Sequence, residues 1–317
     1  MRSHTSRKKL WRWALLGVGL AAVLALGAFS VACGDEEEEG TTTATPAAGG
    51  TSTPQAQQLS GSITVKGSDT MVNLAAAWAE AFSKENPKVS ISVTGGGSGT
   101  GIAALINKQT DIADASRSMT DEEKQKAQSN GVNPVETQVA LDGLSVVLNP
   151  NNPVSELSIP QLSDIYSGKI SNWKDVGGND ASIVVLARDT NSGTHVFFKE
   201  HVVQYENKEL EYGSDVQFMA ATQAGFDEVA QNENAIMYGG LGYVTDEVKA
   251  LGIKKDASSP AVNASIATVK SGEYPIARPL FVYTNGQPTG VLKAYIDWIL
   301  GSEGQAVVEE LEFVPIS

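Results

Sequence analysis

The sequence of 317 residues predicts an α/β fold with a largely parallel sheet, and two observations lead to this prediction. Short apolar stretches, several with the two-residue alternation of strands, take turns along the chain with segments that have the spacing of amphipathic helices. Turns rich in glycine and hydroxyl side chains lie where a strand gives way to a helix. Such alternation is typical of sheets in which each helix returns the chain to begin a parallel strand.

The first elements of the folded region show both periods. Residues 63–65 predict a short strand, and Leu74, Trp78 and Phe82 then recur every fourth residue, which predicts a helix that ends at Pro87. The same patterns predict further strands at 89–93, 111–115, 135–141, 144–148, 183–187, 235–238 and 280–283. They predict helices at 102–106, 160–166, 194–203, 223–231, 288–300 and 303–311, and one more that begins with a capping box of Thr120 and Glu123.

The N-terminal region has the composition of an export signal. Five of the 23 basic residues and none of the 37 acidic residues lie within 1–32, and residues 14–32 are apolar or small throughout. The only cysteine, Cys33, follows directly, in an arrangement that resembles a bacterial lipobox. We therefore predict a signal peptide at 1–32, a lipidated Cys33 and a location outside the cytoplasm, with the lipid anchored in the cell membrane. An uncleaved signal anchor is the alternative.

Residues 33–60 are predicted to form a disordered tether. Four glutamates at 36–39 precede a tract rich in Thr, Ala, Gly, Pro and Gln that has no apolar periodicity. A segment of this composition buries too little apolar surface to offset the entropy lost on ordering. The folded region is therefore expected to begin near Gly61.

Charge and residue counts exclude several classes of function. The formal net charge of −14 argues against nucleic-acid binding, which depends on clustered Lys and Arg. One cysteine rules out an internal disulfide or a CxxC metal site, and three histidines leave little for a metal centre or a catalytic triad. The sequence therefore predicts neither a bound metal nor a cofactor.

Three turns between a strand and a helix concentrate the polar chemistry. They comprise residues 67–70, 95–101 and 188–194, and each combines hydroxyl side chains with glycine. The first amide groups of a helix have no helical partner and lie at the positive end of its dipole. At the carboxyl ends of strands in an open α/β sheet, three such turns could converge on one small oxyanion. Taken singly, each serine or threonine could equally be a plain helix N-cap.

Two arginines and one aspartate stand out beside these turns. Arg117 and Arg188 each follow a predicted strand, and a guanidinium group binds a tetrahedral oxyanion through two parallel hydrogen bonds. Each arginine could instead stabilise the fold through an ion pair. Asp142 is expected at the end of a strand, near a possible crossing between two lobes. A carboxylate beside an anion site implies a ligand that carries a proton.

Five short motifs resemble, in the same order, those of the phosphate-binding proteins of ABC transporters. They are Gly67-Ser68-Asp69-Thr70, Gly97-Ser98-Gly99, Ala115-Ser116-Arg117, Ala140-Leu141-Asp142-Gly143 and Arg188-x-x-x-Ser192-Gly193-Thr194. The segment Ile170-Ser171-Asn172-Trp173 is similar too, and the resemblance extends from about residue 61 to the C-terminus. It implies a type II periplasmic-binding-protein fold: two α/β lobes, with mixed, mainly parallel sheets flanked by helices, hold the ligand in the cleft between them. Lobe I would comprise 61–142 and 278–317, and lobe II 143–277.

The resemblance also implies roles for individual residues. Nine would donate hydrogen bonds to phosphate oxygens: Ser68, Thr70, Ser98, Ser116, Arg117, Arg188, Ser192, Gly193 and Thr194. Asp142 would accept a hydrogen bond from a protonated phosphate and exclude sulfate, which has no proton near neutral pH and would leave the carboxylate unpaired. Asp69 takes a variable place in its motif. The implied function is capture of inorganic phosphate and its delivery to the membrane permease of an ABC importer, by a monomer without catalytic activity.

Two other classes of function stay open. One is a receptor for another tetrahedral oxyanion, such as sulfate or molybdate, or a sensor of phosphate. The other is a hydrolase with Ser98 as its nucleophile, although Thr100 replaces the closing glycine of a nucleophile elbow. A Walker A phosphate loop does not fit either, because Ile102 stands where that motif requires lysine.

Overall fold

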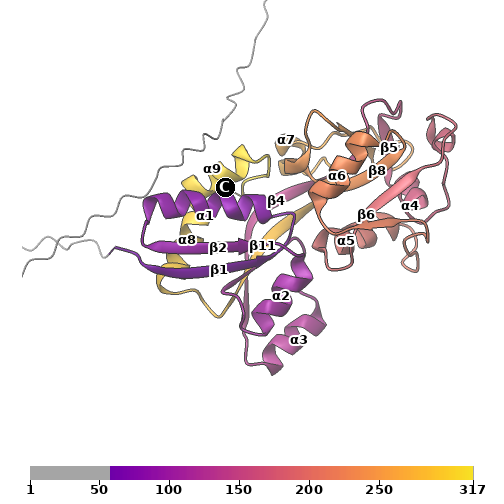
Figure 1. Ribbon diagram of the computed structural model, residues 1–317. Helices are drawn as coiled ribbons and strands as arrows, with labels where there is room; N and C mark the ends of the chain where they lie inside the picture. Colours follow the sequence, from indigo (N-terminus) through magenta and orange to yellow (C-terminus); the bar gives the residue numbers. More distant parts are fainter. Residues whose placement is uncertain (1–57, 317) are drawn as a thin grey trace, which may run out of the picture. The chain divides into compact units, whose positions relative to one another are not determined.

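The computed structural model describes residues 58–316 (Figure 1). The predicted signal peptide, the predicted lipidation of Cys33 and nearly all of the predicted tether at 33–60 lie outside the described residues. Within residues 58–316, no helix is both long and apolar enough to span a membrane.

A mixed sheet runs through the described chain. Its strands lie in the order β2, β1, β3, β11, β4, β8, β6, β7, and β9 pairs with β4. Their bounds are β1 Gly61–Gly67, β2 Val89–Thr94, β3 Ile112–Ala115, β4 Pro134–Leu148, β6 Val184–Arg188, β7 Gln217–Met219, β8 Ala235–Gly240, β9 Lys249–Ala250 and β11 Ala277–Asn285. The short strands β5 Glu156–Ser158 and β10 Gly252–Lys254 pair with each other.

The centre of the sheet is built on β4 and β11. Among the described strands five pairings are parallel and four antiparallel, and every antiparallel one involves β4 or β11. The prediction of separate strands at 135–141 and 144–148 is wrong, because β4 continues through Asp142 and Gly143. The first part of β4 pairs with β11 and the second part with β8. Asp142 therefore does not end a strand but lies where β4 passes from one half of the sheet to the other.

The helices lie close to their predicted positions. They are α1 Val72–Glu85, α2 Ser98–Ile106, α3 Asp121–Ser129, α4 Ile159–Tyr166, α5 Gly193–Phe198, α6 Thr222–Gln231, α7 Ile266–Lys270, α8 Gly290–Leu300 and α9 Ser302–Glu310. The predicted helix at 194–203 is α5 continued by a π-helical turn, Lys199–Val203. The predicted capping box of Thr120 and Glu123 begins α3. The sequence did not predict α7 or the single 3₁₀ turns at Trp173–Val176 and Leu241–Tyr243.

Separate apolar cores stabilise the two halves of the sheet. Helices α1, α8 and α9 cover one face of the β1–β2–β3 half, with Trp78 and Tyr295 in the core between them, and α2 and α3 pack on the other face (Figure 1). In the other half, Tyr166, Phe198 and Tyr238 pack among α4, α5 and β8, and the rings of Phe198 and Tyr238 stack with centroids 3.8 Å apart. Such aromatic burial dominates core energetics.

The carboxyl ends of β1, β2, β3 and β6 position the polar turns. Strands β2, β1 and β3 are adjacent and parallel, so the turns that follow them lie along one edge of the sheet. The turn after β6 comes from the other half and contacts this edge directly. The amide of Gly99 donates to the carbonyl of Asn191 at 3.1 Å. The three polar turns singled out in the sequence are therefore brought together.

Candidate functional site

Three serine hydroxyl groups from different strand ends form one buried cluster. Ser68 Oγ donates to Ser116 Oγ at 3.0 Å, and Ser98 Oγ lies 3.2 Å from Ser116 Oγ. Gly193, the first residue of α5, lies against this cluster from the other half of the sheet. A Cβ atom at Gly193 would stand 2.4 Å from Ser98 Oγ and 2.6 Å from Ser116 Oγ. Only glycine allows the backbone of α5 to approach the hydroxyl groups this closely.

The hydroxyl groups of two turns are not helix N-caps. Neither α1 nor α2 has a side-chain cap, so Ser68, Thr70 and Ser98 do not serve the helices that follow them. The third turn differs, because Ser192 Oγ accepts hydrogen bonds from two amides in the first turn of α5. The N-cap interpretation therefore holds for Ser192 alone among these residues, and its hydroxyl hydrogen is still able to donate.

Two threonines from opposite halves of the sheet meet beside the serine cluster. Their hydroxyl oxygens, Thr70 Oγ1 and Thr194 Oγ1, are 2.7 Å apart and buried. Both accept hydrogen bonds from Arg278, whose Nη2 lies 3.2 Å from Thr70 Oγ1 and 2.8 Å from Thr194 Oγ1. A third arginine, which the sequence had not singled out as a site residue, thus stands among the predicted ligands.

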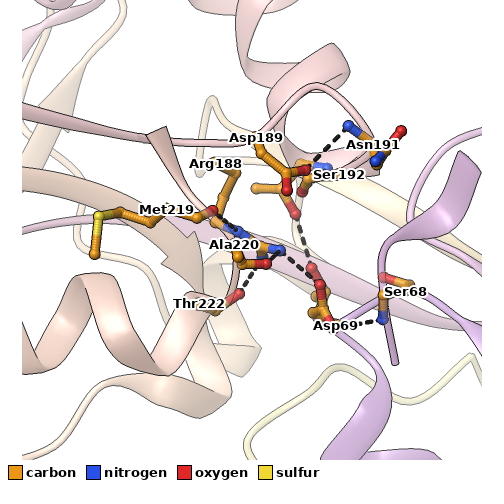
Figure 2. A network of polar contacts seen from close by, with 12 residues as sticks. Ser68, Asp69, Arg188, Asp189, Asn191, Ser192, Met219, Ala220 and Thr222 are labelled. Carbon is orange, nitrogen blue, oxygen red and sulfur yellow. Dashed lines mark hydrogen bonds and ion pairs between the residues drawn. The ribbon is translucent and has the colours of Figure 1, made fainter. Parts of the chain in front are cut away.

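Arg188 lies between the two halves of the sheet, and most N–H groups of its guanidinium donate hydrogen bonds to other residues of the protein (Figure 2). Its Nη2 donates to Asp69 Oδ2 at 2.7 Å and to the carbonyl of Ala220 at 2.9 Å. Its Nε donates to the carbonyl of Met219, and its Nη1 to the hydroxyl of Thr222. Four of the five guanidinium N–H groups are thereby used, so one Nη1 hydrogen is left for a ligand.

Asp69 connects the turns at 67–70 and 95–101 to Arg188 through hydrogen bonds. Its Oδ1 accepts from the amide of Gly96 at 2.9 Å while its Oδ2 accepts from Arg188, and its carbonyl accepts from the hydroxyl of Tyr243. The residue in the variable place of its motif is therefore a connecting residue between both halves of the sheet.

Arg117 is held by the helix that follows it. Its guanidinium forms a two-point pair with Glu123, with both N–O distances at 2.7 Å, and it also donates to the carbonyl of Ser118. Glu123 accepts from the amide of Thr120 as part of the capping box, so the start of α3 fixes the position of Arg117. Its Nε is buried without a partner among the described residues. The predicted ion-pair alternative for Arg117 is thus present, with N–H groups left over.

Asp142 and Arg278 form the most deeply buried ion pair of the described chain. They face each other in the register of β4 and β11, and Arg278 Nε and Nη2 lie 3.2 Å and 2.9 Å from Asp142 Oδ2. Burial raises the pKa of the Asp142 carboxyl, while Arg278 and the backbone N–H of Leu241 act to lower it. Burial lowers the pKa of Arg278, which Asp142 opposes. Arginine nevertheless stays protonated in proteins.

A cavity of about 360 Å³ adjoins the site. Ser116 and Arg117 line it from one half of the sheet, Phe197 from the other, and Arg278 from β11. The ring of Phe197 lies under the Arg278 guanidinium, with Cζ 5.4 Å from the ring centroid. Arg278 therefore belongs both to the buried polar cluster and to the wall of a space that a small ligand could enter.

The structure brings all ten predicted phosphate-binding residues into the region where the two halves of the sheet meet. Sequence reasoning missed Arg278 and the connecting role of Asp69. The scarcity of arginine could have drawn attention to Arg278, but its position opposite Asp142 depends on pairing between residues far apart in sequence. No group of three or more His, Cys, Asp or Glu side chains that could hold a metal ion occurs within residues 58–316.

Comparison with known proteins first defines the class. A profile of the PBP superfamily domain matches residues 21–303. A solved structure of a putative phosphate ABC transporter substrate-binding protein with bound phosphate, from Clostridium perfringens, is 34% identical, with a TM-score of 0.73, and the alignment covers 81% of this chain and 100% of that one. An ABC-type phosphate transport receptor from Vibrio cholerae is 26% identical, with a TM-score of 0.64 and coverage of 80% and 100%.

Curated relatives narrow the class to a family. The phosphate-binding protein PstS of Staphylococcus epidermidis is 32% identical over 259 residues, which cover 79% of this chain and 78% of that protein. PstS of Bacillus subtilis is 30% identical over 302 residues, 94% of each chain. The chain belongs to the PstS family of phosphate-binding proteins within the PBP superfamily. The predicted two-lobe α/β fold is thereby confirmed.

Proposed function

We propose that this protein captures inorganic phosphate between its two lobes and delivers it to an ABC importer. The observation that carries the proposal is the convergence of Ser68, Ser98, Ser116 and the first residue of α5, Gly193, in one buried cluster. Hydroxyl donors and a helix N-terminus together favour a small oxyanion. The printed functions of the relatives from Staphylococcus epidermidis, Bacillus subtilis and Clostridium perfringens support the same ligand.

The proposed ligand set keeps the residues taken from the motifs. Hydroxyl, amide and guanidinium groups donate to phosphate oxygens from Ser68, Thr70, Ser98, Ser116, Arg117, Arg188, Ser192, Gly193 and Thr194. Asp142 accepts the hydrogen bond from the protonated oxygen. In support, Arg117 and Arg188 each have an N–H group left without a protein partner by their ion pairs.

The proposed lobes are joined where β4 and β11 cross. Lobe I comprises 61–142 and 278–317, and lobe II comprises 143–277. The change of partner along β4, from β11 to β8, occurs between Gly143 and Leu144, which supports this boundary. Closure of the lobes over phosphate would sequester the ligand from water.

The protein is further proposed to act at the cell membrane beside a permease. A lipid on Cys33 anchors the protein outside the cytoplasm, the tether lets the lobes reach the permease, and the protein acts as a monomer. Binding and release of phosphate involve no covalent step, so a phosphomonoester incubated with the protein should yield no free phosphate.

Calorimetric titration of the purified protein with phosphate, and then with sulfate as competitor, tests the function. We expect tight binding of phosphate and exclusion of sulfate. Asp142→Asn should weaken that exclusion by about 100-fold, because the amide can donate to a fully deprotonated oxyanion. An Asp164→Asn control, in an exposed pair with Lys169, should leave both affinities unchanged. Equal binding of sulfate and phosphate by the unaltered protein would contradict the proposed function.

A further inference from the structure

We propose that Arg278 is a further phosphate ligand that, together with Asp142, selects for the protonated oxygen of the ligand. The proposal rests on the proposed phosphate-binding function and adds to it a specificity-determining residue that none of the five sequence motifs contains. Four features of the structure support it: the position of Arg278, the unpartnered atoms of the pair, the contact of the Arg278 guanidinium with the Asp142 carboxyl and the contrast with Arg188.

Arg278 lies inside the proposed ligand set. Its Nη2 contacts the hydroxyl oxygens of Thr70 and Thr194, one from each half of the sheet. It also lines the cavity of about 360 Å³ that Ser116 and Arg117 line. A guanidinium at this place lies in reach of any oxyanion held by those residues.

The pair of Asp142 and Arg278 has one acceptor and one donor group without a protein partner. Asp142 Oδ1 and Arg278 Nη1 are both buried and lack a hydrogen-bond partner of good geometry among the described residues, although the backbone N–H of Leu241 lies near enough to the Asp142 carboxyl to lower its pKa. Asp142 is 0% exposed and Arg278 is 2% exposed, so bulk water does not satisfy these atoms. A buried polar atom without a partner is costly, and a structural ion pair normally satisfies both of its members.

A protonated phosphate supplies what both atoms lack. Its P–OH group donates to Asp142 Oδ1, and a neighbouring oxygen of the same phosphorus accepts from Arg278 Nη1. Sulfate can accept a hydrogen bond from Arg278 Nη1 but has no hydrogen to donate to Asp142 Oδ1. The unpartnered donor and acceptor therefore define a ligand that must provide both, which is hydrogen phosphate and not sulfate.

The same arginine favours the ionised, accepting form of Asp142 and so opposes burial, which raises the pKa of this carboxyl. Without a cation in contact, a fully buried carboxyl takes up a proton and becomes a donor, and it would then tolerate sulfate. The other titratable groups that act on the pair are Arg188, Tyr238, Tyr243 and Tyr274. Burial raises the pKa of all three tyrosines, so they stay neutral near pH 7. Arg278 is the cation in hydrogen-bond contact with the carboxylate.

Arg188 provides the contrast within the same site. The protein binds four of its five N–H groups, whereas both N–H groups of Arg278 Nη1 have no protein partner. Arg188 is therefore positioned mainly by the protein, and Arg278 has more hydrogen-bonding capacity left for a ligand.

The test compares Arg278→Lys with Arg278→Gln by calorimetric titration with phosphate and with sulfate. Arg278→Gln removes the cation, so we expect phosphate affinity to fall about 10- to 100-fold and sulfate exclusion to be largely lost. Arg278→Lys keeps a cation, so exclusion of sulfate should persist while phosphate affinity falls less. An arginine that only stabilises the fold, and affects neither the ligand nor the charge of Asp142, would give a different result: both variants would keep the discrimination between the two anions, whatever their affinity.

Two controls distinguish a loss of folded structure from a loss of ligand discrimination. Thermal unfolding of each variant reports loss of structure, and the double variant Asp142→Asn, Arg278→Gln removes both charges of the pair so that no buried charge is left unpaired. We expect the double variant to fold and to bind both anions without discrimination; retained exclusion of sulfate would overturn the proposal. If the unaltered protein fails to bind phosphate, the proposed function is wrong. If the unaltered protein binds phosphate and the Arg278→Gln variant has the same affinity and the same discrimination against sulfate, only the proposed role of Arg278 is wrong.

Discussion

Two buried ion pairs in this protein use the same chemistry in different structural settings. Asp69 and Arg188 come from opposite halves of the sheet and meet across the site, with side chains 15% and 1% exposed. Asp142 and Arg278 are neighbours in the paired strands β4 and β11, with side chains 0% and 1% exposed. Opening of the lobes would separate the first pair and leave the second intact. Loss of the first pair should therefore affect mainly ligand retention, whereas loss of the second should lower the stability of the fold as well as the selectivity for phosphate.

The largest effect is expected from breaking the Asp142–Arg278 pair. Asp142→Ala leaves Arg278 buried and unpaired, which should lower the free energy of unfolding by about 3–5 kcal/mol. Urea denaturation of the unliganded protein measures this change. The double variant Asp142→Leu, Arg278→Met replaces the pair by apolar groups and should recover most of the loss, because the desolvated charge is gone. An Asp142→Ala protein as stable as the parent would remove the distinction between the two pairs.

A smaller effect on a different property is expected from the Asp69–Arg188 pair. Asp69→Asn should lower phosphate affinity about 10-fold through faster dissociation, since the closed form loses a charge-assisted hydrogen bond. Stability without ligand should change little, because water can reach Arg188 when the lobes open. Stopped-flow measurement of phosphate release tests this, with the exposed Asp164→Asn variant as control. Unchanged release together with a large loss of stability would show that Asp69 belongs to the static scaffold.

The sequence could predict those elements of the fold that depend on local patterns, but not those that depend on pairing between distant strands. Strands and helices that are long enough to repeat their hydrophobic period several times lie close to their predicted positions, because this period can be read from neighbouring residues alone. Strands β5, β7, β9 and β10 have only two or three residues, too few for a period to appear. The aspartate and glycine at 142–143 looked like a break, yet β4 passes through them because β11 pairs with β4 as far as Gly143 and β8 pairs with it from Leu144 onward.

The sequence predicted the polar turns of the site but not the ion pairs that connect its residues. Hydroxyls and glycines at strand ends are visible in one sequence, and the structure brings them together. Arg278 was missed because its neighbour Asp142 is fixed by antiparallel register, which no local pattern contains. Asp69 was missed for the same reason: its partner Arg188 belongs to the other half of the sheet.

A third buried carboxylate extends the comparison, because no basic side chain pairs with it in the part of the chain that the structure describes. Asp114 lies in β3 between two buried alanines, and no ion pair within residues 58–316 includes it. Burial raises its pKa from 3.8 to about 8. The folded protein therefore holds a proton that the unfolded chain releases above about pH 4, so the stabilising contribution is full below that pH and is lost as the pH rises to about 8.

Asp114→Asn tests this sign. Between pH 6 and 7 the unaltered protein should lose up to about 1.4 kcal/mol of unfolding free energy per pH unit from Asp114 alone, and the variant should lack this contribution because an amide does not titrate. Urea denaturation at both pH values gives the difference in slope, and Asp121→Asn, which removes an exposed carboxylate, is the matched control. Equal slopes in the Asp114 variant and the parent would mean that Asp114 is ionised in the fold. Burial would then not suffice to keep a carboxyl neutral here, and an ionised Asp142 in the proposed site would not require its arginine.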